Sequence, residues 1–548
     1  MRRGDLGILG FGNLGSNAWA TSAYSCRMAV VRAEKLSESL TQEQRAIVGT
    51  NVLPGETLKV EAAAGAGKST VLRLYAERRP HLQTLYLTFT ASEARAKQSD
   101  YARRGLYHVT VSTLHARAYA VTGDIHHGAV VAALDLTAVA VARVTETSSS
   151  EWPPLRRASL MRVLDCFTAS DAPDIATSHA ESTGCDASAL VSAAQAVWRV
   201  ACDPEDEMPL SHDMYLKLCT LTPELREAMF RDVDLVLLDE AHDCTEAQLM
   251  LVEARQGRTW GSVLVYDFHQ RIYGWRRAAT TRYLRALDAL GVLPLSCSWR
   301  FGGALGRLAA DLLVHHSSTA TRVVGTTTKQ TYIREVPCPP FSEVCGAGRC
   351  LTIVARTRHS LFGHAVEAVL SGAVERISFG SQDTHGTYDL FGGREALLDT
   401  FALSVGRGQH AMLLPASGAG RCAELGFAVY KAAVRAAGSY EAIEACAVVE
   451  RYGSALPELM RKLDMARRSQ SACQLILMSV HDSKGGEWSH VYVSHDLQRP
   501  GGRQDDPEEH EYRLNLLYVA MTRACAALFL PTPVVTSWLL AGVGRRVL

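Results

Sequence analysis

A glycine-containing loop that follows an apolar stretch is the strongest constraint on this chain. The apolar stretch spans residues 57–60, and the loop with the start of the next helical pattern comprises Ala64, Gly65, Ala66, Gly67, Lys68, Ser69 and Thr70. Gly65 and Gly67 lack a Cβ, so consecutive N–H groups can turn onto an anion, which a helix N-terminus also favours. Lys68 would reach the β- and γ-phosphates of a nucleotide, and the Ser69 hydroxyl would bind Mg²⁺. The pattern predicts strand, phosphate loop and helix.

Position 62 departs from the usual spacing of this loop, because Ala62 stands where the pattern has glycine. We expect the change to be tolerated if residue 62 still belongs to the strand. The alternative interpretation of the whole stretch is a glycine-rich turn with a solvated lysine.

Further apolar runs predict more strands of the same sheet. They span residues 85–90, 109–115, 233–238 and 263–267, and helical patterns separate them. Strands that alternate with helices indicate a parallel α/β sheet, in which the carboxyl ends of the strands converge on a ligand-binding edge.

Two acidic residues end the run at 233–238 and have the chemistry that a bound Mg–nucleotide needs. Asp239 would hold Mg²⁺ through water, and Glu240 would orient and deprotonate the attacking water. The alternative is a strand followed by an acidic cap of the next helix.

Aromatic and basic side chains alternate after the run at 263–267. Tyr273, Trp275 and Arg276 lie in this segment. Aromatic rings next to arginines suit stacked bases and a phosphate backbone, and each stacked base contributes about 1–3 kcal/mol. A core position for Tyr273 and Trp275 is the alternative.

Composition limits the other classes of function. Lys+Arg and Asp+Glu balance at 57 each, so any nucleic-acid binding must come from a local groove rather than from net charge. The 14 cysteines contain no C-x-x-C pair, and Cys338, Cys345 and Cys350 give only a weak metal signal beside the alternative of free thiols. We therefore expect a reducing, intracellular compartment, and no apolar run is long enough to span a bilayer.

Taken in order, these segments resemble the helicase motifs of the superfamily 1 UvrD/Rep branch, over roughly residues 38–535. The matching positions are Gln44, Gly65 to Thr70, Thr88 to Thr90, Thr113 to His115, Asp239 to Ala241, Asp267 with Gln270 to Arg276, Ser298 to Arg300, His481 to Glu487, and Tyr518 to Ala524. The probability that so many segments match in this order by chance is very small.

Within that branch the chain most resembles the F-box DNA helicases, known as antirecombinases. Residues 209–217, 243–244, 299–302, 355–357, 450–453 and 515–518 carry the likeness. About 40 residues precede Gln44, so we expect no F-box and no ubiquitin-ligase role. Because 25 residues follow Arg523, we also expect no fused nuclease domain.

The resemblance implies a role for each matching residue. Trp299 would stack on adenine, Gln44 would read the edge of the base, and Glu487 would contact the ribose. Gln270, Arg300 and Arg523 would converge on the γ-phosphate, where the two arginines would neutralise charge that develops in the transition state. The residues expected to line single-stranded DNA are Phe89, His115, Tyr273, Trp275, Arg276 and His481.

Four positions depart from the pattern of the branch. His242 stands where the branch usually has glutamine. This difference concerns the coupling of hydrolysis to movement of the DNA strand. Gly486 replaces the usual leucine, Arg358 the usual asparagine and Cys525 a usual basic residue. None of the four removes a group that hydrolysis needs.

The expected fold is α/β, with two RecA-like P-loop domains that have parallel sheets, each interrupted by a mostly helical insertion. The expected parts are a disordered or targeting leader at 1–37, the first lobe at 38–115 and 206–294, a helical insertion at 116–205, the second lobe at 295–379 and 471–548, and a second helical insertion at 380–470.

The expected function is an ATP-dependent DNA helicase or translocase that moves 3′-to-5′ on single-stranded DNA in recombination control or DNA repair, with ATP and Mg²⁺. Alternatives are a DNA-dependent translocase that strips proteins without unwinding, a phosphate-loop kinase or GTPase, and an inactive binding module. Expected partners are single-stranded DNA, duplex junctions and recombinase filaments, with no membrane. We expect a monomer in the nucleus, and a mitochondrial or viral origin stays open.

Overall fold

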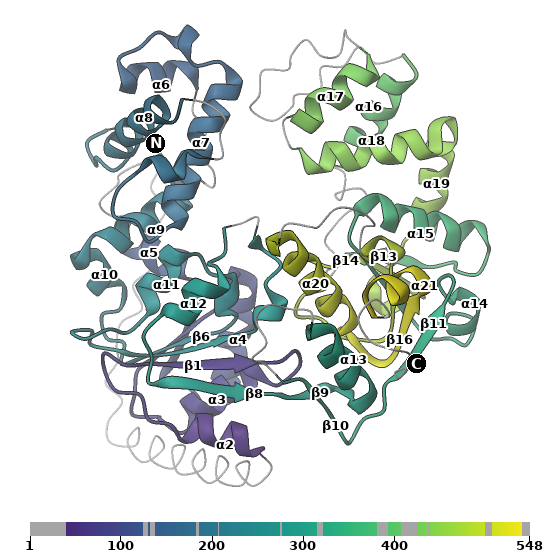
Figure 1. Cartoon of the computed structure of the whole chain (residues 1–548), viewed down its shortest axis with the longest axis horizontal. Coiled ribbons are helices and arrows are strands. Elements are labelled where there is room, and N and C mark those ends of the chain that lie inside the picture. Colours follow the sequence, from purple (N-terminus) through teal and green to yellow (C-terminus); the bar gives the residue numbers. More distant parts are fainter. Residues whose placement is uncertain are drawn as a thin grey trace, which may run out of the picture.

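The structure is a computed structural model of the chain. It describes residues 40–123, 130–131, 137–181, 186–206, 208–274, 277–314, 322–380, 393–406, 426–436, 439–498 and 507–539. The expected leader and two expected DNA contacts, Trp275 and Arg276, lie outside these residues. Two α/β bodies lie side by side, and a group of helices extends from the same side of each (Figure 1).

The first body is built on a six-stranded sheet of order β3-β2-β6-β7-β1-β8, in which all neighbours are parallel. Its strands are β1 (Thr57–Ala62), β2 (Thr84–Leu87), β3 (Val109–Ser112), β6 (Leu235–Leu238), β7 (Gly261–Tyr266) and β8 (Gly291–Leu295). Strands β1, β6 and β7 are buried throughout, as expected for a parallel sheet covered on both faces. The predicted parallel α/β sheet is confirmed.

Helices cover this sheet and extend from it. Those beside the sheet are α2 (Gln42–Gly49), α3 (Lys68–Glu77), α4 (Ala91–Arg103), α11 (Glu246–Val252) and α12 (Thr281–Ala286). Those of the extension are α5 (Leu114–Thr122), α6 (Ala138–Thr145), α7 (Pro154–Ala169), α8 (Ala187–Ala201), α9 (His212–Leu221) and α10 (Pro223–Met229). Two short strands, β4 (Val130–Val131) and β5 (Leu210–Ser211), pair in parallel within the extension.

The second body repeats the design with the strand order β11-β16-β15-β12-β14-β13, again all parallel. Its strands are β11 (Tyr332–Val336), β12 (Leu351–Ala355), β13 (Ile377–Phe379), β14 (Leu475–Ser479), β15 (Trp488–Val493) and β16 (Ala524–Pro531). Its helices are α13 (Gly303–Leu313), α14 (Phe341–Val344), α15 (Arg358–Leu370), α16 (Arg394–Ser404), α17 (Phe427–Ala436), α18 (Tyr440–Tyr452), α19 (Leu456–Ala466), α20 (Pro507–Met521) and α21 (Thr532–Val534). Two parallel sheets fit the expected RecA-like fold class; the exact domain limits stay a prediction.

One strand at the start of the expected second lobe lies outside the second sheet. Strand β9 (Cys297–Gly302) falls within the expected limits 295–379, but it pairs only with β10 (Val324–Thr326) among the described strands. The reason lies in the backbone of β9, because the Trp299 N–H donates to the Gly65 carbonyl at 2.9 Å. Strand β9 is thus drawn toward the phosphate loop of the first body.

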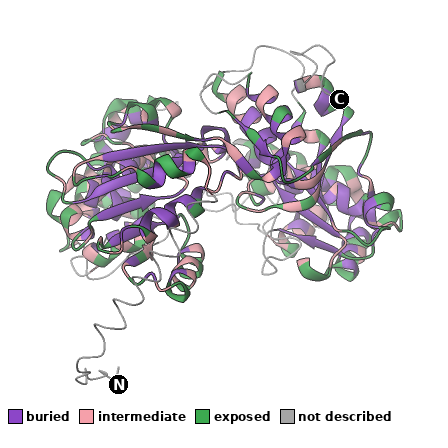
Figure 2. Ribbon diagram, turned by 90° about the horizontal axis from the view of Figure 1, so that it is seen from below, coloured by how far each residue is buried: buried purple, intermediate pink, exposed green. Residues whose placement is uncertain are grey.

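One hydrophobic cluster spans both bodies. It joins Ala64, Ala66 and Ile272 of the first body to Val480 and Tyr518 of the second, all of them fully buried. Figure 2 shows the buried strands inside each body and the buried segments where the bodies meet. No helix among the described residues has the length and apolar character needed to cross a membrane.

Candidate active site

The phosphate loop has the backbone that the sequence predicts. Ala62 is the last residue of β1, so it still belongs to the strand, which is the condition under which alanine can replace the usual glycine there. Helix α3 begins at Lys68. Gly65 and Gly67 have φ angles of 71° and 85°, in the left-handed region that glycine adopts without strain. A Cβ on Gly65 would also lie 2.6 Å from Ser298 Oγ, so the close approach of β9 requires glycine there.

The expected metal ligands lie together at the start of α3. Ser69 Oγ donates a hydrogen bond to Asp239 Oδ2 at 2.6 Å, and Tyr86 donates to the same oxygen at 2.7 Å. A hydroxyl and a carboxylate at this separation are ligands of the type that Mg²⁺ prefers. Lys97 of α4 places its ammonium 3.3 Å from Asp239 Oδ2 and 3.2 Å from Ser69 Oγ, a contact that sequence reasoning missed.

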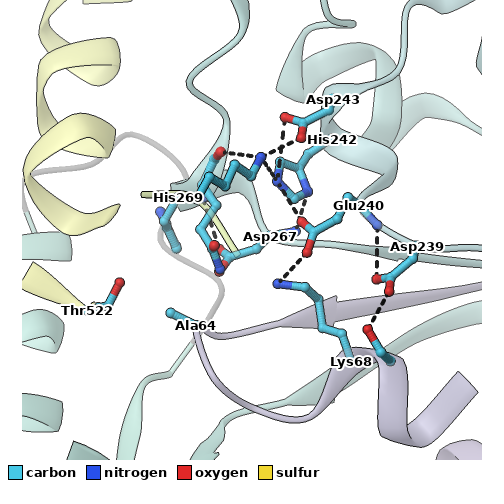
Figure 3. Close-up of polar contacts among 12 residues, drawn as sticks. Ala64, Lys68, Asp239, Glu240, His242, Asp243, Asp267, His269 and Thr522 are labelled. Atoms are coloured by element: carbon cyan, nitrogen blue, oxygen red, sulfur yellow. Dashed lines mark hydrogen bonds and ion pairs between the residues drawn. The ribbon is translucent and has the colours of Figure 1, made fainter. Parts of the chain in front are cut away.

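Glu240 follows Asp239 in a left-handed conformation, with φ of 55°. Its Oε1 lies 3.5 Å from Lys68 Nζ, so the expected base and the expected phosphate-binding lysine meet (Figure 3). Burial alone would raise the pKa of Glu240, but the ammonium groups of Lys68 and Lys484 outweigh it and the pKa is lowered. Glu240 is therefore an ionised carboxylate that can accept a proton.

A hydrogen-bonded chain links the two bodies next to the phosphate loop. Asp267 Oδ2 accepts from Gln270 Nε2 at 2.6 Å, and Gln270 Oε1 accepts from an Arg523 terminal nitrogen at 3.2 Å. Burial raises the pKa of Asp267 to about 6. Burial and the nearby charge of Arg300 lower the pKa of Arg523 to about 9, so Arg523 is still a cation at neutral pH.

Arg300 reaches the same region from β9. Its Nε donates to Glu487 Oε2 at 3.1 Å, and one terminal nitrogen donates to the Thr522 carbonyl at 2.9 Å. A Cβ on Gly65 would lie 2.7 Å from Arg300 Cβ, which places the arginine backbone against the phosphate loop. Gln270, Arg300 and Arg523, which were expected to converge, thus lie in one region, because Arg523 bonds Gln270 and Arg300 bonds the carbonyl of the residue before Arg523.

The other end of the loop carries the residues expected to hold the base. Gln44 is buried and its Oε1 accepts the Thr41 N–H at 3.1 Å in a helix-capping arrangement. A Cβ on Gly67 would lie 3.6 Å from Gln44 Nε2 and 3.9 Å from Trp299 Cδ1, so both side chains border the loop. Trp299 is 40% exposed, which leaves its ring accessible for stacking.

Three of the expected DNA contacts form a row of rings. Phe89 and Tyr273 stack with centroids 6.4 Å apart and planes 12° apart, and Tyr273 lies 5.7 Å from the His481 ring. The Tyr273 hydroxyl also donates to the His481 carbonyl at 3.2 Å, across the two bodies. The row therefore spans the junction between the bodies.

His115 shares a pocket with Phe89. Both line one open pocket together with Tyr119, His212 and Tyr215, and His115 pairs with Asp213 at 3.3 Å. Sequence reasoning gave no site role to Tyr119, His212 or Tyr215; His212 and Tyr215 belong to the segment 209–217, which marked only the family likeness. The three thiols at 338, 345 and 350 do not form a metal-sized group within the described residues.

Two segments of the chain match known domain families. Residues 173–290 match the UvrD/REP helicase N-terminal domain, and residues 474–530 match the UvrD-like helicase C-terminal domain. The predicted resemblance to UvrD/Rep helicases is confirmed by these two matches.

Curated relatives extend the likeness over most of the chain. F-box DNA helicase 1 of Gallus gallus is 25% identical over 535 residues, which cover 92% of this chain and 50% of that protein. F-box DNA helicase protein 1 of Schizosaccharomyces pombe is 26% identical over 562 residues, which cover 91% of this chain and 58% of that protein. The chain thus spans little more than half the length of these relatives.

Proposed function

We propose that the chain is an ATP-dependent motor that moves on single-stranded DNA and separates duplex strands. The observation that carries the proposal is the link from Asp267 through Gln270 to Arg523, because it joins the phosphate-loop body to an arginine of the other body. A cation from the second body can stabilise the transferring phosphoryl group only when the bodies are packed together. Hydrolysis and the relative position of the bodies are therefore coupled.

The proposed nucleotide lies along the phosphate loop. Trp299 stacks on the adenine, Gln44 contacts the edge of the base, and Glu487 contacts the ribose. The loop N–H groups and Lys68 bind the phosphates, and Arg300 and Arg523 approach the γ-phosphate from the second body. Glu240 takes the proton of the water whose oxygen bonds to the γ-phosphorus, while the bond from that phosphorus to ADP breaks.

Mg²⁺ would be held by Ser69 and Asp239, whose oxygen atoms fit a hard cation. When bound, the ion neutralises charge on the phosphates. The chain itself orients these oxygens. Tyr86 contributes to this through its hydrogen bond to Asp239.

The proposed single strand runs over the row of Phe89, Tyr273 and His481. Rings from both bodies contribute to this row, so a change in the relative position of the bodies moves stacked bases along it. The 3′-to-5′ direction is proposed from the resemblance to the UvrD/Rep branch. The role in recombination control or repair is proposed from the likeness to F-box DNA helicases.

The proposal is tested by ATP hydrolysis with and without single-stranded DNA, followed by strand separation on duplexes with a 3′ or a 5′ tail. We expect DNA to stimulate hydrolysis and only the 3′-tailed duplex to be unwound, with Lys68→Ala as the inactive control. Hydrolysis that ignores DNA would support a kinase or GTPase instead. Displacement of a protein bound to the DNA without strand separation would support the stripping translocase, and unwinding from 5′ tails alone would reverse the proposed direction.

A further inference from the structure

The side chain of Lys484 crosses the junction between the two bodies. Lys484 belongs to the turn after β14 of the second body, and its side chain is 9% exposed. Its Nζ is paired with the carboxylate of Asp243, donates to the Gln270 carbonyl at 3.0 Å and lies 3.0 Å from His242 Nε2. All three of these groups belong to the first body, so the ammonium is held by one body and its backbone by the other.

Asp243, the ion-pair partner, is a buried carboxylate whose charge depends on Lys484. Its side chain is 5% exposed, and its Oδ1 is buried without a hydrogen-bond partner among the described residues. Burial raises the pKa of Asp243 to about 6, while the Lys484 ammonium acts in the opposite direction. The Asp243 N–H donates to the Glu240 carbonyl at 2.9 Å. Lys484 is therefore joined by one ion pair to the turn that carries the proposed base.

The turn that contains Lys484 also holds a ring of the proposed DNA row. Lys484 Nζ lies 5.1 Å from the centroid of the Tyr273 ring, within the range of a cation–π interaction. The Tyr273 hydroxyl and the Lys484 backbone N–H both donate to the His481 carbonyl, each at 3.2 Å. Tyr273 stacks on Phe89. A base that contacts this row therefore meets a ring that is bonded to the turn of Lys484.

We propose that Lys484 is a positioning residue that couples DNA binding to ATP hydrolysis, an inference that rests on the proposed function. One end of the link is the row of rings that contacts DNA. The other end is the turn of Glu240 and the main chain of Gln270, whose side chain bonds Arg523. Lys484 itself touches neither ATP nor DNA. It acts by holding these groups of the first body against the second body.

The desolvation of the ammonium explains why the link responds to DNA. Lys484 leaves water when the bodies pack together, which is costly unless all of its partners are in place. When the bodies separate, Lys484 returns to water and the contact between Gln270 and Arg523 is lost. A strand stacked on rings from both bodies opposes this separation, because the rings would lose the bases. DNA therefore shifts the population toward the arrangement in which Arg523 lies beside the phosphate loop.

The same junction offers a matched control residue. Asn515 of α20 is buried, and its amide nitrogen donates to the Phe268 carbonyl at 3.2 Å and to the Arg271 carbonyl at 3.1 Å. These two bonds also join the second body to the first, but neither of them involves Asp243 or Tyr273. Asn515→Ala therefore weakens the junction without breaking the proposed link.

Two variants remove the ammonium. Lys484→Met keeps much of the length of the side chain and removes its charge, but it leaves Asp243 as an unpaired buried carboxylate, which is strongly destabilising. Lys484→Met combined with Asp243→Asn removes both charges and avoids this penalty. The double variant thus tests the proposal even if the single variant does not fold.

The experiment measures the ratio of the ATP hydrolysis rates at saturating single-stranded DNA and without DNA, with thermal unfolding as the check on folding. In Lys484→Met and in the double variant we expect this ratio to fall by at least about fivefold, the lower end of the usual coupling between two sites. Asn515→Ala should keep the ratio of the unmodified chain. In a Tyr273→Ala background, Lys484→Met should have little further effect on the ratio, because the ring end of the link is already missing.

Three outcomes would overturn the coupling role. They are an unchanged ratio in the folded double variant, a loss of equal size in Asn515→Ala, and additive losses when Lys484→Met is combined with Tyr273→Ala. An unmodified chain whose hydrolysis is not stimulated by DNA would instead contradict the proposed function itself, since there would be no stimulation to lose.

Discussion

Replacement of Arg523 by methionine should separate activity from stability. Arg523 is 1% exposed, and burial is the main reason why its pKa falls from 12.5 to about 9. A pH unit corresponds to about 1.36 kcal/mol, so the buried charge is unfavourable by roughly 5 kcal/mol in the folded state at neutral pH. Hydrogen bonds to the Val519 and Gly486 carbonyls and to Gln270 offset part of this penalty.

Arg523→Met retains the aliphatic volume and removes the charge. We expect the free energy of unfolding to change little, because relief of the buried charge offsets the cost of leaving the acceptors of Arg523 without their donor. We expect the hydrolysis rate to fall by about 10³- to 10⁵-fold, the usual effect of losing an arginine that stabilises phosphoryl transfer.

Thermal unfolding of the nucleotide-free protein and single-turnover ATP hydrolysis test the two halves of this expectation. Arg523→Lys is the matched control, because it retains a cation without the planar group that bonds Gln270. The reasoning is refuted if Arg523→Met unfolds at a much lower temperature while the folded fraction hydrolyses ATP at the normal rate. That outcome would make Arg523 a structural residue.

Three further measurements bear on the site. Tyr273→Ala should weaken single-stranded DNA binding by about 1–3 kcal/mol and leave DNA-free ATP hydrolysis nearly unchanged; equal losses of both would favour a core role. Lys97→Met should lower the Mg²⁺ concentration for half-maximal ADP binding by about two- to fivefold. The reason is that the partly exposed Lys97 ammonium, whose interaction with Asp239 contributes about 0.5–1 kcal/mol, no longer competes with the ion. An unchanged Mg²⁺ titration would contradict this expectation. The pKa of Asp267 is raised to about 6, so the folded state takes up this proton before the unfolded state does, and stability from this group increases as the pH falls from about 6 toward 4. Asp267→Asn should remove that increase in thermal unfolding curves, and an identical pH dependence would exclude Asp267 as its source.

Local sequence predicted the parts of the site that a single segment forms. The phosphate loop follows from two glycines, a lysine and a serine at fixed spacing, and the strand before Asp239 follows from the mostly apolar run at 233–238. The packing of these strands into one parallel sheet follows from the alternation of strands and helices.

The contacts between distant side chains could not be predicted from residue patterns. Gln270 and Arg523 are 253 positions apart, and only the resemblance to a known family suggested that they meet. The sequence shows only that Lys97 belongs to a basic helical segment. Its contact with Asp239 could not be predicted, because the direction of the side chain depends on how α4 packs on the sheet. The hydrogen bond from the Asp267 N–H to His242 Nδ1 joins the ends of two strands, and no local pattern around His242 contains it.

The bond between the Trp299 N–H and the Gly65 carbonyl has a mechanical consequence. Strand β9 is the segment by which the chain leaves the first sheet, at the end of β8, and enters α13 of the second body. The segment that connects the two bodies is therefore hydrogen-bonded to the loop that we propose receives the phosphates. A nucleotide that shifted this loop would therefore act directly on the connection between the bodies, and through it on the row of rings at their junction where we propose that DNA lies.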